Sequence, residues 1–104
     1  MTKSGDKEQL ALDAIRRGNL SEVKKWMKKV SVDATNSSGQ TPLHLACVEG
    51  HFSVVQYLVE KKKANPDARD RDGWTPLHCA CHGDHIEIVD FLISQNANVT
   101  IETG

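Results

Sequence analysis

The hydrophobic residues of this chain recur with a helical period in two similar stretches. In residues 51–61, HFSVVQYLVEK, and residues 85–94, HIEIVDFLIS, apolar side chains fall at i, i+3, i+4 and i+6 or i+7. This spacing places them on one stripe of a helix. A shorter apolar run precedes each stretch and starts with Thr-Pro, in which the threonine suits a helix cap and the proline suits the first helical turn. We therefore expect short helices at about 42–49 and 76–82, each followed by a second helix.

The two helix pairs are copies of one unit. Residues 39–60, GQTPLHLACVEGHFSVVQYLVE, align with residues 73–94, GWTPLHCACHGDHIEIVDFLIS, at a constant offset of 34. A fainter upstream copy, at an offset of 32, lacks the Thr-Pro-Leu-His and predicts helices at about 6–17 and 20–29. Helices this short cannot bury their apolar stripes alone, so neighbouring pairs must stack to form a core.

Polar, turn-rich segments, SVDATNSSG and ANPDARDRDG, join the helix pairs and predict hairpin-like loops. The segments TPLHLACVEGH and DGWTPLHCA resemble the ankyrin repeat, a unit of about 33 residues with a Thr-Pro-Leu-His-x-Ala signature. The resemblance covers nearly the whole chain and implies an all-α ankyrin-repeat solenoid of helix-turn-helix units joined by β-hairpin-like loops. We expect a single domain, with an N-terminal capping repeat at about 1–36, repeats at 37–70 and 71–104, and an end within the next hairpin.

Some residues depart from the family pattern. Asp84 stands where the family usually has the glycine of its Gly-His pair, and its spacing from Glu87 predicts a capping box at the start of the second helix. Asn19 and Glu22 have the same spacing. Asn96 occupies a position where the family commonly has a left-handed glycine, a conformation that asparagine tolerates.

Composition and charge exclude several classes of protein. The chain has 104 residues, 38% of them hydrophobic, and a net charge of −1 from 13 Lys and Arg against 14 Asp and Glu. Such a balance gives no overall field to attract nucleic acid or an anionic membrane. No apolar run approaches the roughly 18 residues of a membrane span, and MTKSGDKEQL lacks the apolar core of a secretory signal. We expect a monomer in the cytoplasm, with the nucleus as the alternative, and neither nucleic acid nor membrane as a partner.

The stretch HCACHGDH has the composition of a transition-metal site. Three of its residues, His78, Cys81 and His85, fall on positions that the preceding repeat also fills with His, Cys and His. Cys79 and Cys81 lie roughly 200° apart around a helix and cannot converge on one ion. We therefore expect hydrogen-bonded histidines, a core position for Cys81 like that of Cys47, and neither a metal nor another cofactor.

No catalytic site is predicted either. A cysteine nucleophile needs a histidine in reach and a cleft that excludes water, and the chain shows neither a glycine-rich phosphate loop nor a convincing pair of carboxylates. The lysines of KKWMKK and EKKK fall in the second helices or at their ends, where cations favour the helix dipole, and are assigned to a solvated convex side. Trp26 aligns with core leucines and is expected to be buried.

The expected functional surface is the concave face formed by the hairpin tips and the exposed positions of the first helices. The resemblance implies variable contact positions before the signature threonine and just after the Ala-Ala pair. Carried onto this sequence, the expected partner-binding residues are Arg16, Arg17, Ser37, Ser38, Gln40, Val48, Glu49, Arg71, Asp72, Trp74 and His82. Trp74 is the type of residue that anchors an interface, and the alternative is that it packs over the neighbouring hairpin at Gln40.

These features predict a non-catalytic protein–protein interaction module that binds a protein partner through its concave face. One alternative is an N-terminal targeting or regulatory segment of a larger enzyme or signalling protein, since the chain stops within a hairpin at NVTIETG. Another is a small-molecule- or metal-responsive domain that uses the cysteines and histidines.

Overall fold

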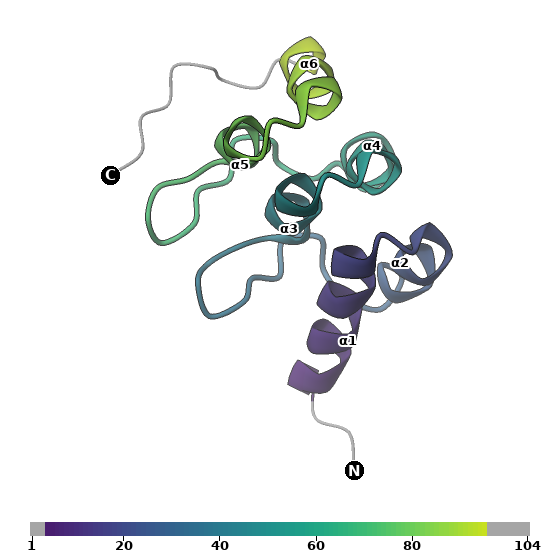
Figure 1. The fold of residues 1–104 in the computed structure, drawn as a ribbon. Helices are drawn as coiled ribbons and strands as arrows, with labels where there is room; N and C mark the ends of the chain where they lie inside the picture. Colours follow the sequence, from purple (N-terminus) through teal and green to yellow (C-terminus); the bar gives the residue numbers. More distant parts are fainter. Residues whose placement is uncertain (1–3, 96–104) are drawn as a thin grey trace.

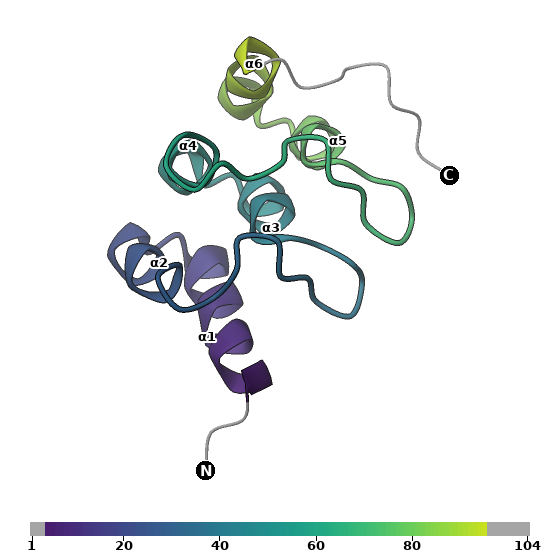
Figure 2. The same cartoon turned by 180° about the vertical axis from the view of Figure 1, so that it is seen from behind.

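In the computed structural model, which describes residues 4–95, the helices stack as three pairs. They are α1 (Ser4–Arg17) with α2 (Leu20–Trp26), α3 (Pro42–Glu49) with α4 (Phe52–Glu60), and α5 (Pro76–His82) with α6 (Ile86–Ser94). The first helices form one layer and the second helices another, and the loops before α3 and α5 project from the first layer on the side away from the second (Figure 1, Figure 2). The described residues contain no strand, so the all-α prediction is confirmed. Among residues 4–95 no helix combines the length and apolarity that crossing a membrane requires.

The first helices of the two signature repeats begin where the sequence predicts, because their capping signals are local. The Thr41 hydroxyl accepts the His44 N–H at 3.3 Å, and His44 Nδ1 accepts the Thr41 N–H at 3.1 Å. Thr75 and His78 repeat this capping box at 3.2 and 3.3 Å. Because Nδ1 of His44 accepts, its Nε2 carries the proton and donates to the carbonyl of Trp74 at 2.8 Å. The cap of α3 is thereby tied to the loop before α5.

A second set of histidines, those of the Gly-His positions, joins successive helix pairs. His51 Nε2 donates to the carbonyl of Arg16 at 2.7 Å, and His85 Nε2 donates to the carbonyl of Val48 at 3.1 Å. These carbonyls belong to the last turns of α1 and α3, where no intrahelical partner exists. The second and third helix pairs each donate one such histidine hydrogen bond to the first helix of the pair before.

The core lies between the two layers and continues through the stack. Ile15, Leu43, Leu58 and Leu92 are fully buried at successive levels, as expected if each pair buries its stripe against its neighbours. The rings of Phe52 and Phe91 meet edge to face with centroids 5.6 Å apart, which extends the contact between α4 and α6.

Two local predictions differ from the structure, and a third lies outside the residues that it describes. Helix α2 ends at Trp26 rather than near residue 29. After it, the N–H of Lys29 donates to the Trp26 carbonyl three residues earlier, a hydrogen bond typical of a 3₁₀ turn at a helix end. Asp84 does not cap α6: it has a φ of 59° and precedes the N-cap, His85, which makes no side-chain cap bond. The reason is that this turn requires a left-handed residue, which Gly50 supplies in the preceding repeat with a φ of 76°. Asn96 lies outside the described residues.

The capping box predicted at Asn19 and Glu22 is half formed. The Asn19 Oδ1 accepts the N–H of Glu22 at 3.2 Å. The carboxylate of Glu22 does not reach back to Asn19 and instead pairs with Arg17, at 2.6 Å from Nη2 to Oε2. Asn19 therefore caps α2 alone.

Cys81 is exposed, which contradicts the prediction of a core position. Its counterpart Cys47 is fully buried inside the stack, and Cys79 is buried as well. Cys81 differs because no further described helix pair packs on α5. Burial raises the pKa of the Cys47 thiol and raises the pKa of Cys79 to about 11, with the charge of Asp70 adding to the latter shift. Both buried thiols are therefore poor nucleophiles at neutral pH.

Trp26 is also less buried than predicted. It is half-buried and packs against the edge of the core. The ammonium groups of Lys25 and Lys29 lie 6.0 and 5.9 Å from its ring centroid, within the range of cation–π attraction. Its neighbours on the second layer are therefore partly charged rather than apolar.

The buried His44 is expected to make the stability of the fold depend on pH. Its side chain is fully buried, and burial lowers its pKa from the ordinary value of 6.5, an effect that the Trp74 carbonyl opposes. Because the unfolded chain then binds more protons, stability is expected to be lost as the pH falls below 6.5 and to level off below the folded pKa. Urea denaturation of wild type and His44→Gln at a series of pH values around 6.5 tests this. The free energy of unfolding of the variant should depend less steeply on pH. An unchanged slope in His44→Gln would assign the effect to other groups.

Candidate functional site

Two projecting loops, residues 36–40 and 70–74, share one hydrogen-bond pattern. The Asn36 Oδ1 accepts the backbone N–H groups two and four positions later at 2.9 and 3.0 Å. The Asp70 Oδ1 does the same, with both distances 2.9 Å. In addition, the N–H of Asn36 donates to the Gln40 carbonyl at 3.0 Å, and that of Asp70 donates to the Trp74 carbonyl at 2.9 Å. A short polar side chain at the first position thus fixes the shape of each loop.

The two loops lie against each other. The N–H of Arg71 donates to the carbonyl of Ser38 at 3.0 Å. Gly39 has a φ of 78°, and a Cβ at this residue would lie 3.0 Å from the Arg71 nitrogen and 3.2 Å from its Cγ. Gly39 therefore permits the close approach, and the stem of Arg71 lies against loop 36–40.

The loops and the first helices border a groove with two hollows. The α1 hollow, of about 430 Å³, is lined by Glu8, Gln9, Leu12, Arg16, Thr35, Asn36, Ser37, Ser38 and Gln40. The Trp74 hollow, of about 250 Å³, is lined by Gln40, Val48, Asp70, Asp72, Trp74, Cys79, His82 and Gly83. Because Gln40 lines both hollows, they are neighbours along one groove.

Most of the expected partner-binding residues line this groove. The structure places eight of the eleven in the two hollows: Arg16, Ser37, Ser38, Gln40, Val48, Asp72, Trp74 and His82. The other three, Arg17, Glu49 and Arg71, line neither hollow. That any of the eleven contacts a partner stays a prediction.

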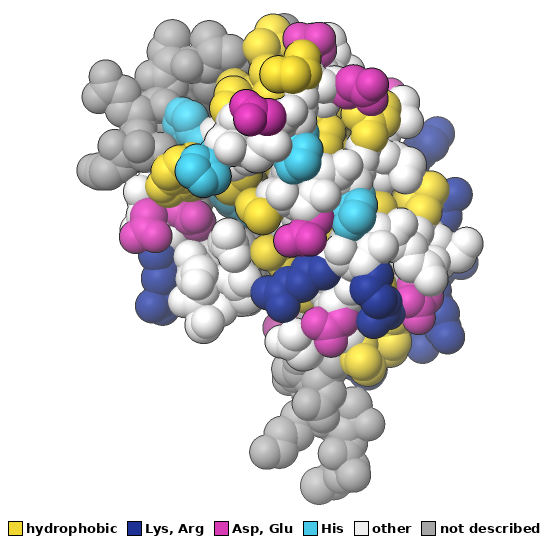
Figure 3. Space-filling view, viewed as in Figure 1, with side chains coloured by type: hydrophobic (Ala, Val, Ile, Leu, Met, Phe, Trp, Pro, Cys, Tyr) yellow, Lys and Arg dark blue, Asp and Glu magenta, His cyan; other side chains and the backbone are white. Residues whose placement is uncertain are grey.

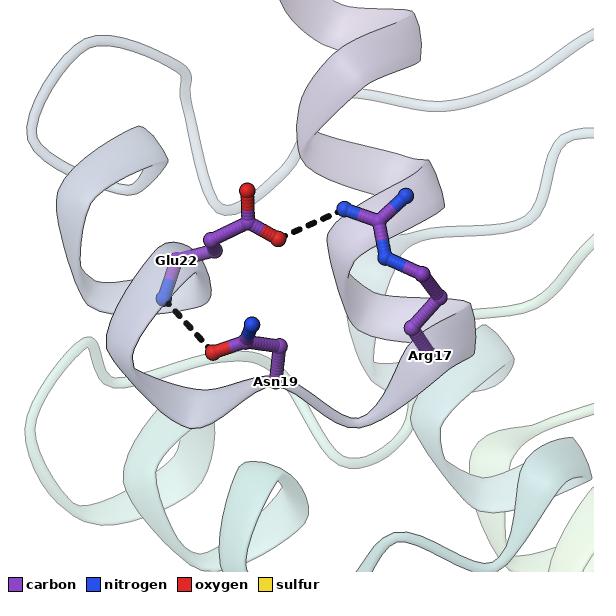
Figure 4. Close-up of polar contacts among 3 residues, drawn as sticks. All are labelled: Arg17, Asn19 and Glu22. Carbon is purple, nitrogen blue, oxygen red and sulfur yellow. Dashed lines mark hydrogen bonds and ion pairs between the residues drawn. The ribbon is translucent and has the colours of Figure 1, made fainter.

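Arg17 lies at the turn between α1 and α2, where it is held by a local contact. The guanidinium pairs with Glu22, whose N–H is in turn bonded to Asn19 (Figure 4). The two charged side chains are 59% and 42% exposed, so water screens the pair and it adds little to stability. Its effect is to direct Arg17 toward α2.

Trp74 is half-buried and packs against two histidines of its own repeat. Its ring centroid lies 6.0 Å from that of His78 and 5.6 Å from that of His82, with the rings nearly perpendicular. The indole thus packs within its own repeat, and part of it still lines the hollow beside Gln40. Figure 3 shows histidine, hydrophobic and acidic side chains side by side where the loop before α5 projects.

The sequence did not indicate several residues of the groove. Glu8 and Leu12 share a face of α1 with the predicted Arg16, because the three residues are spaced four apart. This periodicity could have revealed the wall of the α1 hollow. Cys79 aligns with the buried Leu45 and gave no sign that it also lines the Trp74 hollow. Asp70 was treated as a turn residue, although it contributes a carboxylate to the hollow.

Two other surfaces of the molecule are candidates. A hollow of about 340 Å³ lies between Gly50 and the start of α6, beside Ile86, whose side chain is 62% exposed. Exposed lysines gather on α2 and after α4, and the Lys24 ammonium lies 5.8 Å from the Tyr57 ring centroid. Neither surface shares a lining residue with the groove.

The cysteines and histidines form no metal centre in the part of the chain that the structure describes. No three His, Cys, Asp or Glu side chains among residues 4–95 are grouped so that they could hold a metal ion. Nδ1 of His78 is committed to Thr75, and the rings of His51 and His85 are committed to carbonyls. These imidazoles have structural partners.

Comparison with known proteins gives two results. A family model described as ankyrin repeats (3 copies) matches residues 11–103. A human protein, ankyrin repeat domain-containing protein 7, is 40% identical to this chain over 47 residues. The match covers 43% of this chain and 18% of the length of that protein.

Proposed function

The chain belongs to the ankyrin-repeat family, and on that premise we propose that it is a non-catalytic module that binds a protein partner through the groove. Ankyrin repeats are generally protein–protein interaction modules. The observation that carries the proposal is that the α1 hollow and the Trp74 hollow lie next to each other, with Gln40 lining both. A continuous groove of this kind suits an extended segment of another protein.

The groove is largely preformed, which favours binding. Its loops are held by the side chains of Asn36 and Asp70, and the caps of α3 and α5 hold its helices. Little backbone entropy remains to be lost when a partner docks, so more of the contact energy contributes to affinity. We place this activity in a monomer in the cytoplasm, with the nucleus as the alternative.

A second candidate function is that of a targeting or regulatory segment in a larger protein. The match to the human relative spans only 18% of that protein's length, so domains of this type occur within longer chains. The same groove would then recruit the partner for the rest of the protein.

Placing a charge in the wall of the groove is expected to abolish partner binding. Val48 lies in the last turn of α3, is 41% exposed and lines the Trp74 hollow. Val48→Glu puts a carboxylate where a partner would bury an apolar surface, and a loss of at least about tenfold in affinity is expected. Partner proteins captured from a cell extract by wild type are identified by mass spectrometry, and their affinities are then measured by titration calorimetry.

Ile93→Glu is the matched control for Val48→Glu. Ile93 is 47% exposed on α6, and it lines neither hollow of the groove. Both substitutions replace an exposed β-branched residue of a helix by glutamate, and circular dichroism verifies that both variants fold. If the two variants bind the partner equally well, the groove is not the binding site.

A further inference from the structure

The Trp74 hollow combines negative charge with an aromatic surface. Its lining residues include the acidic Asp70 and Asp72, the aromatic Trp74 and the apolar Val48. No lysine or arginine of the described chain is among its lining residues, and His82 is the one histidine among them. Two acidic residues thus line the same hollow, and no arginine or lysine of the described chain lines it with them.

The carboxylates are not neutralised by ion pairs elsewhere. In residues 4–95 neither Asp70 nor Asp72 takes part in a salt bridge, and the Asp72 carboxylate accepts no hydrogen bond. The Asp70 Oδ1 accepts two backbone N–H groups of its loop, which positions the group and does not cancel its charge. Its field reaches the floor of the hollow, where it contributes to the raised pKa of Cys79.

The basic residues next to these aspartates are directed elsewhere. The Cγ of Arg71 lies beside Gly39 on the neighbouring loop, and the Nε–H of Arg69 donates to the Gly73 carbonyl at 3.3 Å. Neither arginine lines the Trp74 hollow. The described chain thus places no arginine or lysine in the hollow, which leaves it open to a cationic side chain of a binding partner.

We infer that the Trp74 hollow binds an arginine side chain of the protein partner, a step that rests on the proposed function of the groove. The planar guanidinium stacks on aromatic rings and donates two parallel hydrogen bonds to a carboxylate, and it loses less hydration than the ammonium of lysine. Trp74 and Asp72 provide these two contacts, and Val48 covers the aliphatic stem. The residues that flank the arginine in the partner then extend toward Gln40 and the α1 hollow.

Selection of peptides tests both the groove and this subsite. A library of random short peptides displayed on phage is selected on the full chain, with Val48→Glu protein used to remove peptides that do not need the groove. The inference predicts that the enriched peptides share an arginine beside an apolar residue. If they depend on Val48 but share no arginine, the inference is wrong and the proposed function stands. If no groove-dependent peptide is enriched, the proposed function fails and the inference fails with it.

Affinity measurements on one enriched synthetic peptide then test the contacts. Replacing its arginine by citrulline, which keeps the shape and removes the charge, is expected to weaken binding about tenfold. Asp72→Asn should weaken the arginine peptide by a similar factor and leave the citrulline peptide unchanged. Asp90→Asn, the same charge change at an exposed residue of α6, is the control and should have no effect. Equal affinity of wild type and Asp72→Asn for the arginine peptide would overturn the inference.

Discussion

Replacing His44 by alanine is expected to lower the free energy of unfolding by about 3 kcal/mol. The imidazole is fully buried, and its removal leaves a cavity at the junction of α3 and loop 70–74. It also leaves the Thr41 N–H without its acceptor. The Trp74 carbonyl then accepts one hydrogen bond, from the Asp70 N–H, where it accepted two before. Urea denaturation followed by circular dichroism measures the loss.

The matched control for this substitution is His78→Ala. His78 occupies the same position of the next repeat and forms the same capping box with Thr75, but it is only half-buried, and its Nε2 has no hydrogen-bond partner among residues 4–95. Its replacement should cost about 1 kcal/mol, the value of a capping interaction alone. Equal losses in the two variants would mean that the bond from His44 to Trp74 contributes nothing.

Gly50→Ala is expected to destabilise the fold by about 2 to 3 kcal/mol. Gly50 has a φ of 76°, and a Cβ at this residue would lie 2.5 Å from Cε1 of His85. The imidazole must therefore move, and its 3.1 Å bond to the Val48 carbonyl is lost. The left-handed conformation of a residue with a side chain adds to the cost.

A double-mutant cycle with His85→Ala separates these two causes. In the His85→Ala background the clash is absent, so Gly50→Ala should cost only about 1 kcal/mol for the left-handed conformation. Thermal unfolding of the four proteins gives the coupling. If Gly50→Ala costs the same in both backgrounds, the contact between the two helix pairs does not determine the need for glycine.

Asp84 shows that the requirement for glycine at Gly50 is not a property of the local sequence. It occupies the same position as Gly50 and has a φ of 59° although it carries a side chain. At Gly50 the histidine of the next pair fills the space of a side chain, whereas no further described pair packs on Asp84. The sequence therefore suggested a cap at Asp84, and only the stack shows why one position requires glycine and the other tolerates aspartate.

The starts of the helices could be predicted from local capping residues, whereas the burial of individual side chains depends on residues that are distant in sequence. Thr41 and Pro42 specify the start of α3 within a few residues of sequence, and its bounds were predicted correctly. Cys81 and Trp26 were misplaced because their burial depends on what packs on the outer repeat and on the second layer. A residue's position in the repeat thus predicts its level in the stack but not its exposure.

The groove was predictable in outline from the family resemblance. Gln40 and Trp74 were assigned to it from their positions in the repeat, and both line it. Arg17 and Arg71 were assigned in the same way, but contacts with Glu22 and with loop 36–40 direct them out of it. The direction of a long side chain is set by such contacts, which alignment to a repeat does not contain.

We propose that the protein partner occupies the groove bordered by α1, α3, α5 and the two loops. A crystal structure of the chain with a groove-selected peptide tests it most directly. We expect the peptide to lie across the two hollows and to contact both Trp74 and Gln40. A peptide bound beside Ile86, or over the lysines on α2 and after α4, would show that the groove is not the binding site.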